Sequence, residues 1–293
     1  MTWLDELGDN CRREVPLGPL TWFKLGGPAE YFVEPKSEEQ LAHVVKMCRE
    51  TNTPLRILGL GANLLVGDAG VRGVVVQLTA EPFTKIAFDG NTCQAAAGVS
   101  LAKLVLATVR RGLAGLEHLA GIPASVGGAI RMNCGGRYGD ISTAVHTVRV
   151  ISPAGDIYLR DHDDLDFGYR HCNLGGDLVV GASFNLTPTD PEELHTRFRE
   201  IWMYKQNTQP PMGDSSAGCI FKNPDGQSAG QLIDRAGLKG LRIGGAYVSD
   251  RHANFIMADA GARADDVRKL IEAVREKVRE THGVRLTPEI QIW

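Results

Sequence analysis

The 293-residue sequence has no long hydrophobic run and no excess of positive charge. No apolar stretch approaches the ~20 residues that a membrane-spanning helix requires, and residues 1–9 are acidic where a signal peptide carries cations. The net charge of -3 argues against nucleic acid or an anionic membrane as the main partner, because both favour clustered Lys and Arg. We therefore expect a cytoplasmic protein without membrane insertion.

Common motifs for metal and dinucleotide binding are also missing. The 6 cysteines are scattered, with no C-x-x-C pair, and none of the 8 histidines lies in H-E-x-x-H or at zinc-finger spacing. There is no G-x-x-x-x-G-K-[ST] phosphate loop, and Leu64 takes the third-glycine position of a G-x-G-x-x-G pattern starting at Gly59. We expect free thiols, no metal and no Rossmann fingerprint.

Two polar segments allow a functional and a structural interpretation. The acidic segment 161–166 invites a metal interpretation, but it lacks the glycine and distal glutamate of a calcium loop, which favours a solvated turn. Directly after it, Arg170 offers a guanidinium that could bind a carboxylate through a forked contact. An arginine after a turn is also a common surface residue, so both interpretations stay open.

Apolar periodicity predicts an α/β chain in three parts, with boundaries near residues 80 and 190. Residues 37–40 form a capping box, which predicts the start of a helix. The expected strands are 29–35, 55–58, 73–78, 148–158, 178–186 and 286–293. The expected helices begin at Ser37 and Ser100, cover 191–204, and include the apolar positions 267–278 before Gly283. Residues 188–190 are expected to form a linker.

Two glycine-rich stretches can let a ligand approach the backbone closely. The first, 59–63, follows a predicted strand, and the second, 121–128, lies in the segment 120–136, which must turn often. Both could present rows of backbone N–H groups to a pyrophosphate. Spacing alone leaves a purely structural role equally open for either loop.

The segment 216–224 places a thiol, a cation and an amide in one short loop. Gly218 lets the backbone approach a ligand, Lys222 offers a point charge for phosphate or carboxylate, and Cys219 carries a proton. Such a loop can hold an anionic ligand and protonate it. The alternative is a turn that contains one half-buried free cysteine.

Taken together, several ordered segments resemble the UDP-N-acetylenolpyruvoylglucosamine reductase family, flavoenzymes that make UDP-N-acetylmuramate for bacterial cell walls. The matching segments are residues 21–30, 58–66, 119–139, 167–170, 217–224, 236–245, 248–255 and 286–290. The short distance between Arg170 and Cys219 resembles the shorter of the family's two subtypes, which lacks an extra loop over the substrate.

The resemblance implies an α/β (α+β) fold, with a two-part FAD-binding domain of the vanillyl-alcohol-oxidase type and a substrate-covering α+β domain. Residues 1–80 and 81–190 would form the two FAD-binding subdomains. Residues 191–293 would form the substrate-binding domain, whose C-terminal strand returns to the active site. The implied activity is NADPH-dependent reduction of UDP-N-acetylenolpyruvoylglucosamine to UDP-N-acetylmuramate in peptidoglycan precursor biosynthesis.

The resemblance also implies site residues, by motif. Arg170 and Glu289 match the catalytic pair around the enolpyruvyl carboxylate, and Cys219 lies where most members have a proton-donating serine. The residues that match FAD-binding loops are Gly59, Leu60, Gly61, Ala62, Asn63, Leu64, Gly121, Ile122, Pro123, Ser125, Val126, Gly127 and Gly128. The residues that match UDP-sugar segments are Tyr169, Lys222, Asn223, Ser249, His252 and Asn254.

Two residues depart from the family pattern. Ala62 stands where the flavin loop usually has serine, which removes one hydroxyl but leaves the backbone amides, so FAD should still bind. A thiol is more acidic than an alcohol, so Cys219 can serve as the general acid.

Two other functions compete with this interpretation. An oxidase or dehydrogenase of the broader flavoprotein group would often carry a His or Cys for covalent flavin attachment, and residues 59–63 contain neither. We therefore expect FAD to be bound non-covalently. A non-catalytic nucleotide-binding or cell-wall regulatory protein would not need Arg170 and Glu289.

Overall fold

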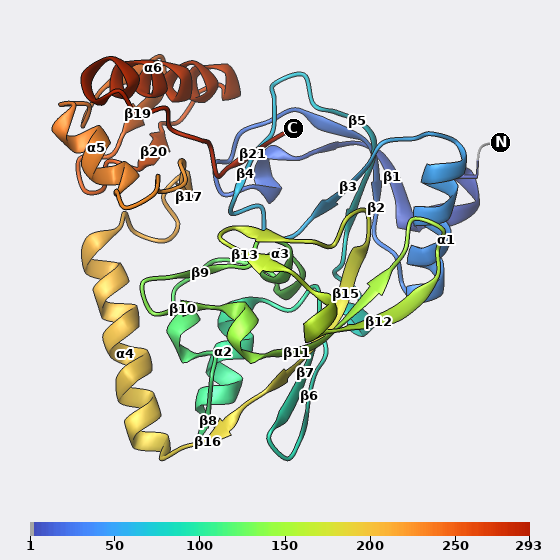
Figure 1. Ribbon diagram of the computed structural model, residues 1–293. Helices are drawn as coiled ribbons and strands as arrows, with labels where there is room; N and C mark the ends of the chain where they lie inside the picture. Colours follow the sequence, from blue (N-terminus) through green and yellow to red (C-terminus); the bar gives the residue numbers. More distant parts are fainter. Residues whose placement is uncertain (1–2) are drawn as a thin grey trace. The chain divides into compact units, whose positions relative to one another are not determined.

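The computed structural model describes residues 3–293 (Figure 1). These residues form two compact units, each assembled from separated stretches of the chain. The first unit contains residues 3–13, 31–60 and 73–205, and the second contains residues 14–30, 61–72 and 206–293. Met1 and Thr2, which open the predicted first subdomain, lie outside the described residues. The division into three parts stays a prediction.

A four-stranded sheet contains the strands predicted near the start of the chain. Its order is β1-β2-β5-β3, and β3 runs parallel to β5. The strands are β1 (Cys11–Pro16), β2 (Pro28–Val33), β3 (Leu55–Leu58) and β5 (Val71–Gln77). The predicted strands at 29–35, 55–58 and 73–78 are confirmed, with slightly different ends.

Helix α1 (Glu38–Glu50) begins at the predicted capping box. Ser37 Oγ accepts a hydrogen bond from the Gln40 amide at 3.2 Å, and Gln40 Oε1 accepts one from the Lys36 amide at 2.8 Å. The first bond satisfies an amide that the first helical turn leaves without a partner, and the second ties the residue before the N-cap to the same turn. The apolar face of α1 is buried as predicted. It consists of Leu41, Val44, Val45 and Cys48.

An antiparallel five-stranded sheet forms the centre of the first unit, in the order β12-β11-β15-β7-β6. The strands are β6 (Ile86–Asp89), β7 (Thr92–Ala96), β11 (Val145–Ile151), β12 (Ile157–Asp161) and β15 (Leu178–Asn185). The prediction of one strand over 148–158 was wrong. Residues 152–156 form a turn in which Gly155 has φ 90°, so the segment is a hairpin.

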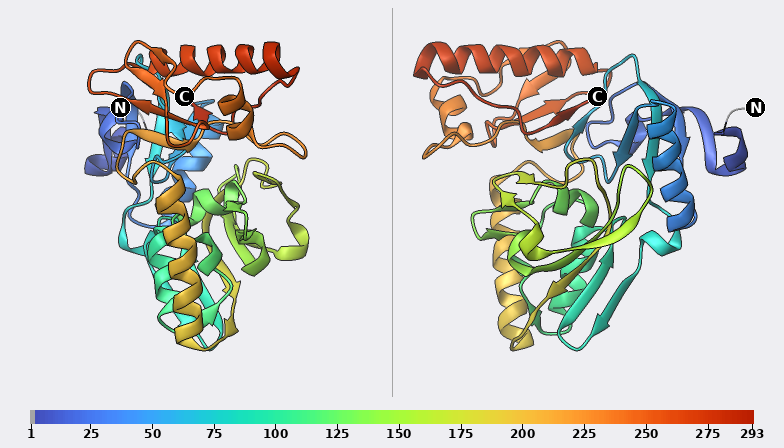
Figure 2. Two further views of the ribbon diagram at one scale, coloured as in Figure 1. Left: turned by 90° about the vertical axis from the view of Figure 1, so that its left-hand side faces the viewer. Right: turned by 45° about the vertical axis from the view of Figure 1, so that its right-hand side comes forward.

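Helices and short two-stranded ladders complete the first unit. The helices are α2 (Leu101–Val109), α3 (Val126–Arg131) and α4 (Pro191–Thr208), which Figure 2 shows as one unbroken helix. Residues 191–205 of α4 belong to this unit and residues 206–208 to the second. The ladders pair β8 (Leu113–Ala114) with β16 (Thr187–Pro188), β9 (Gly135–Gly136) with β10 (Gly139–Asp140), and β13 (Phe167–Gly168) with β14 (His171–Cys172). The glycine-rich segment 120–136 therefore contains a helix, and the predicted linker 188–190 begins inside a paired strand.

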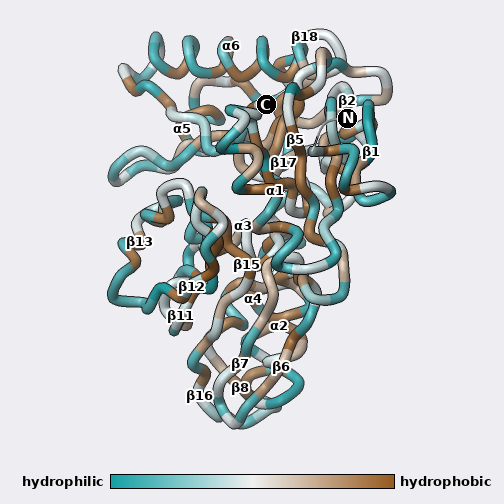
Figure 3. The backbone as a smooth tube through the Cα atoms, turned by 90° about the vertical axis from the view of Figure 1, so that its right-hand side faces the viewer, coloured by the Kyte–Doolittle hydropathy of each residue, from teal (hydrophilic) through white to brown (hydrophobic). Residues whose placement is uncertain are grey.

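The second unit contains an antiparallel sheet in the order β17-β20-β19-β18, which α6 contacts through β18 and β19. Its elements are β4 (Leu64–Leu65), β17 (Ser216–Cys219), α5 (Ala229–Arg235), β18 (Arg242–Ile243), β19 (Ala246–Val248), β20 (Phe255–Ala258), α6 (Ala264–His282) and β21 (Gln291–Ile292). Hydrophilic and hydrophobic positions alternate along α6 (Figure 3). Gly283 ends this helix as predicted, with φ 70°.

The predicted C-terminal strand is shorter than expected. The strand assigned to 286–293 covers only β21, and Pro288 instead forms an isolated bridge with Phe221. A proline has no amide to donate to a ladder, so the regular strand begins after it. The short 3-10 helices are η1 (Asp5–Asn10), η2 (Gly18–Leu20), η3 (Glu81–Phe83), η4 (Glu117–Leu119), η5 (Ile141–Ala144) and η6 (His162–Asp164).

Each unit has its own hydrophobic core. The core of the first unit includes Phe83 and Phe184, and that of the second includes Phe23 and Phe221, all at most 2% exposed. None of the 6 cysteines, all of which lie within the described residues, forms a disulfide. Cys48, Cys93, Cys134 and Cys172 are buried, as predicted for small apolar side chains.

Candidate functional site

The first glycine loop begins directly after β3, and Gly59 has no room for a side chain. A Cβ at Gly59 would lie 2.6 Å from Ser125 Oγ, the atom that caps α3 by accepting from the Gly128 amide at 3.3 Å. The Gly59 carbonyl accepts a hydrogen bond from Gln77 Nε2 at 3.3 Å. The first and second glycine loops are therefore packed against each other at Gly59 and Ser125, both in the first unit.

Gly61 needs glycine for a different reason. Its φ is 66°, and a Cβ there would lie 2.4 Å from the Leu20 carbonyl oxygen. Among residues 3–293, none accepts a hydrogen bond from the amides of Ala62 and Asn63. Donors of this kind in a tight glycine turn fit the phosphate oxygens of FAD.

The second glycine loop uses most of its amides within the protein. Val126 and Gly127 donate to the carbonyls of Val99 and Ala97, at 2.8 and 2.9 Å, and Gly128 donates to Ser125. Ile122 donates to Leu119 at 3.1 Å. The predicted row of N–H groups is therefore occupied, and a cofactor at these residues would contact mainly other backbone and side-chain atoms. Their predicted role, with that of Gly121 and Pro123, stays a prediction.

Arg170 lies at the tip of the β13–β14 hairpin, with a backbone conformation that is unusual for arginine. Its φ is 55°, in the left-handed region, which costs a non-glycine residue about 1–2 kcal/mol. Its Nη2 donates to the Gly135 carbonyl at 2.9 Å, and its guanidinium lies 5.1 Å from the ring centroid of Tyr169. Non-glycine residues in strained conformations are concentrated at functional sites.

Lys205, at the C-terminal end of α4, was not predicted as a site residue. Its Nζ donates to the carbonyl oxygen of Ala120, the residue before the second glycine loop, at 2.6 Å. Burial lowers the pKa of Lys205 to about 8, and the positive charge of Arg170 contributes in the same direction. Burial disfavours the charged form of the nearby Cys134 as well, and raises its pKa to about 12. A lysine in an amphipathic helix gives no sequence signal for such a position.

In the second unit, the strand that ends in Cys219 lies beside the segment that carries Glu289. Cys219 pairs with Phe255 in the sheet and is half-buried. The Glu289 amide donates to the Ile220 carbonyl at 2.8 Å, and the Lys222 amide donates to the Thr287 carbonyl at 2.9 Å. The fold therefore brings these two predicted catalytic segments together, although 69 positions separate them in the sequence.

The part of the first glycine loop that belongs to the second unit, from Gly61 on, is hydrogen-bonded to the segment that carries Glu289. Asn63 Nδ2 donates to the Glu289 carbonyl at 3.2 Å, and the Gln291 amide donates to the Asn63 carbonyl at 3.1 Å. Immediately afterwards, β4 pairs with β21 in parallel, with Leu64 opposite Gln291. The predicted flavin-loop residues Asn63 and Leu64 thus fix the backbone around Glu289.

Three predicted substrate residues use their side chains inside the fold. The Asn254 carboxamide accepts from the Phe221 amide at 3.0 Å and donates to the Phe221 carbonyl at 2.8 Å. Asn223 Oδ1 accepts from the Ala229 amide at 3.0 Å, at the start of α5. Ser249 Oγ accepts from two following amides, at 3.2 and 3.4 Å. These contacts are structural; contact with substrate stays a prediction.

His252 is also engaged within the second unit. Its Nδ1 accepts a hydrogen bond from the Asn254 amide at 3.2 Å, and its ring lies edge-on to Phe255 with 4.9 Å between centroids. Burial lowers the pKa of His252, so the ring is neutral at pH 7. Nδ1 must then be the acceptor nitrogen, which leaves Nε2 to carry the proton.

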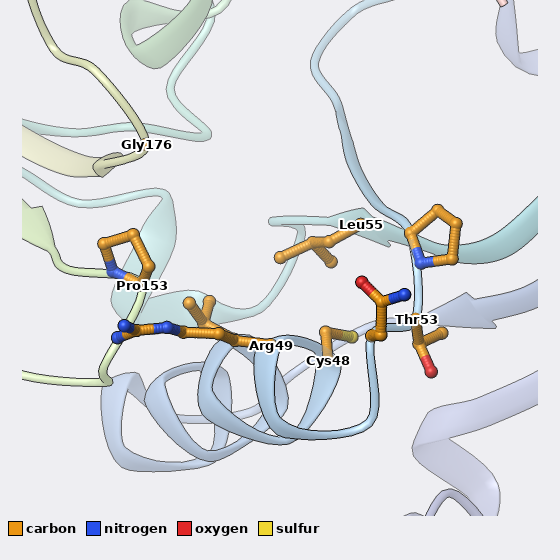
Figure 4. Close-up of a pocket in the computed structure, with 9 residues that line it drawn as sticks. Cys48, Arg49, Thr53, Leu55, Pro153 and Gly176 are labelled. Atoms are coloured by element: carbon orange, nitrogen blue, oxygen red, sulfur yellow. The ribbon is translucent and has the colours of Figure 1, made fainter.

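A separate hollow of about 380 Å³ lies in the first unit beside α1 (Figure 4). It is lined by Val45, Cys48, Arg49, Asn52, Thr53, Pro54, Leu55, Pro153 and Gly176. The sequence predicted none of these as site residues. Burial raises the pKa of the Cys48 thiol to about 11, so this cysteine is not a nucleophile at neutral pH.

Across residues 3–293, no helix has the length and apolar character needed to span a membrane. The same residues contain no group of three or more His, Cys, Asp or Glu side chains arranged to bind a metal ion. The acidic segment 161–166 folds in part as η6, and its His162 ring stacks on Phe167 with 5.9 Å between centroids.

Family models match two parts of the chain. Residues 29–159 match an FAD binding domain, and residues 209–293 match the C-terminal domain of UDP-N-acetylenolpyruvoylglucosamine reductase. The reductase of Heliobacterium modesticaldum is 42% identical over 283 residues, which are 96% of this chain and 90% of that protein. The reductase of Azorhizobium caulinodans is 39% identical over 289 residues, 98% of this chain and 93% of that protein.

The chain belongs to the UDP-N-acetylenolpyruvoylglucosamine reductase family. The crystal structure of the family reductase from Thermus caldophilus agrees, with 39% identity, a TM-score of 0.84, and coverage of 97% of this chain and 99% of that one. These findings confirm the predicted family and fold class, an FAD-binding domain with a second α+β domain. They also confirm an FAD-binding oxidoreductase of peptidoglycan precursor synthesis.

Proposed function

We propose that this chain of the reductase family reduces UDP-N-acetylenolpyruvoylglucosamine to UDP-N-acetylmuramate in the cytoplasm, with NADPH as reductant and non-covalently bound FAD. The observation that supports this most strongly is the pairing, in one unit, of the Cys219 and Glu289 segments through the Glu289 amide and the Ile220 carbonyl. A proton donor and a carboxylate carried on adjacent segments suit protonation of a carbon next to a carboxylate.

The first glycine loop is the better candidate for the FAD pyrophosphate. The amides of Ala62 and Asn63 are available there, and Gly61 lets the turn close without a side chain. Loss of the usual serine hydroxyl at Ala62 leaves these donors in place. Bound FAD would supply hydride transfer from NADPH to the enolpyruvyl double bond.

Arg170 would bind the substrate carboxylate. Hydride addition to the double bond leaves negative charge on the carbon next to this carboxylate, and the charge spreads onto the carboxylate oxygens. A planar guanidinium can hold both oxygens at once, and its contact strengthens as the charge grows. The bond from Arg170 Nη2 to the Gly135 carbonyl fixes one edge of the guanidinium beforehand.

Cys219 would donate its proton to the same carbon, and Glu289 would stabilise or help protonate the intermediate. The positive φ of Gly218, 69°, turns the chain just before Cys219, and a Cβ at Gly218 would meet nothing within 4 Å. The backbone before the thiol is therefore open on that side. Lys222, Asn223, Tyr169, Ser249, His252 and Asn254 are proposed to contribute to the UDP-sugar region.

The test is a pair of measurements on the purified protein. It should be yellow and release its flavin on acid or heat treatment. In the absence of oxygen it should consume more than one equivalent of NADPH per flavin only when the enolpyruvyl UDP-sugar is present. A protein that stays colourless after FAD addition would contradict the cofactor proposal. A flavoprotein that does not consume NADPH with this substrate would contradict the proposed reaction.

A further inference from the structure

The hairpin that carries Arg170 is fixed at two points by one short segment of the first unit, residues 133–135. At its base, Asn133 Nδ2 donates to the Gly168 carbonyl at 3.0 Å. At its tip, Arg170 Nη2 donates to the Gly135 carbonyl at 2.9 Å. The same segment therefore determines the position of strand β13 and the position of the guanidinium.

Asn133 is itself held in a single arrangement. It is 3% exposed, and its amide donates to the Ile130 carbonyl at 3.0 Å at the end of α3. Its Oδ1 accepts from the Ser142 amide at 3.3 Å, so both ends of the carboxamide have partners. Its φ is 39°, a conformation that asparagine tolerates better than most residues.

Arg170 depends on such support because its own backbone conformation is unfavourable. Only Tyr169 and Arg170 lie between the paired residues Gly168 and His171, and Arg170 has φ 55°. If the base of the hairpin is released, the tip can relax toward an ordinary conformation and move the guanidinium. A forked contact with a carboxylate depends on orientation as much as on charge.

We propose that Asn133 is a positioning residue for Arg170. Its carboxamide holds the hairpin 167–172 through the Gly168 carbonyl, so that the guanidinium is already oriented when the substrate carboxylate arrives. This inference rests on the proposed function of Arg170. Asn133 does not touch the substrate and acts only through the hairpin, so its removal slows the step that uses Arg170 and no other.

Asn133→Asp is the sharpest variant, because it keeps the acceptor for Ser142 and loses the donor to Gly168. We expect reoxidation of reduced flavin by the enolpyruvyl substrate to slow roughly 10–100-fold, the usual effect of misplacing a catalytic group by about 1 Å. Substrate affinity, measured by calorimetry, should fall as well. Flavin reduction by NADPH in the same protein should be unchanged.

Two further variants separate positioning from general damage. Asn133→Gly suits the left-handed backbone and also lacks the carboxamide, so it should show the same selective loss even if the aspartate variant folds poorly. Asn52→Ala removes another left-handed asparagine, with φ 52°, from the end of α1. It should lower thermal stability without changing the substrate half-reaction.

The decisive comparison repeats Asn133→Asp in an Arg170→Ala protein. There it should slow reoxidation by less than about 2-fold, because the effect of a positioning residue disappears with its target. Equal slowing with and without Arg170, or wild-type reoxidation in both Asn133 variants, would overturn the inference. If Arg170→Ala itself reoxidises normally, the proposed role of Arg170 fails instead.

Discussion

The carboxamide of Asn254 forms two hydrogen bonds with the backbone of Phe221, one to its amide and one to its carbonyl, as a neighbouring strand would. Both residues are at most 3% exposed. Each bond joins the segment after Cys219 to the segment that contains Ser249 and His252. The predicted substrate residue Asn254 therefore has a clear structural role, which can be tested by stability.

Asn254→Ala should lower the free energy of unfolding by about 2–4 kcal/mol, because each buried polar group left without a partner costs about 1–3 kcal/mol. Urea denaturation would measure it. Ser228→Ala, which removes the bond that Ser228 Oγ accepts from the Gln231 amide at the start of α5, is the control and should lose about 1 kcal/mol. Equal losses in the two variants would contradict the double role of Asn254.

Arg170→Lys should be nearly as damaging as Arg170→Ala, because a point charge cannot reproduce a forked, planar contact with a carboxylate. The defect should appear in flavin reoxidation by the substrate, and reduction by NADPH should be spared. Stopped-flow measurement of the two half-reactions would check this. Slow reduction with normal reoxidation would show that Arg170 acts elsewhere.

Cys219→Ser should keep substantial activity, whereas Cys219→Ala should slow the substrate half-reaction roughly 10²–10⁴-fold, the usual contribution of a positioned proton donor. If Cys219 only fills space, alanine and serine should give similar rates and differ modestly in stability. Solvent deuterium incorporation into the product provides the second readout. An alanine variant with wild-type rate and normal labelling would remove Cys219 from the mechanism.

Gly59→Ala should destabilise the protein by about 1–3 kcal/mol and weaken FAD binding, because its Cβ would lie 2.6 Å from Ser125 Oγ. Gly136→Ala is the control, since a Cβ there meets nothing within 4 Å and neither glycine has a positive φ. In a Ser125→Ala background the cost at Gly59 should shrink. Thermal unfolding with and without added FAD would measure both effects.

Lys205 should make stability depend on pH. Its pKa in the folded protein, about 8, lies below the ordinary 10.5, so the unfolded chain binds more protons between these values. The wild type should therefore gain stability relative to Lys205→Met as pH rises from 8 to 10.5, and lose it again as pH falls through 8. Lys205→Arg stays charged throughout and should show no gain. Melting temperatures of the wild type and the two variants at pH 7 and pH 10 test this prediction. If the melting temperatures of wild type and Lys205→Met change equally between the two pH values, the prediction is wrong.

The local parts of the fold could be predicted from the sequence because their signals are local. The capping box at Ser37, the helical spacing of Leu41 and Val44, and the terminating Gly283 each act within one or two turns. The hairpin at 148–158 was missed although Ser152, Pro153 and Gly155, which are typical turn residues, separate its two apolar runs. Its register depends on partner strands that the segment itself does not encode.

The site was predictable only in part, and for a similar reason. Motifs identified Arg170, Cys219 and Glu289, but no motif shows that the Glu289 amide pairs with Ile220. Nor could spacing show that the amides of Val126 and Gly127 are already used by Val99 and Ala97. Lys205 was not predicted as a site residue, because its burial and its lowered pKa result from packing and not from its residue type.

The order in which the second unit can be completed during synthesis follows from its discontinuous sequence. Its core includes Phe23 and Leu65, and β4 pairs with β21, at Gln291 and Ile292. The N-terminal contributors therefore leave the ribosome more than two hundred residues before the strand they pair with. Until β21 has been synthesised, β4 keeps an open edge, and this exposed edge favours chaperone binding or misfolding.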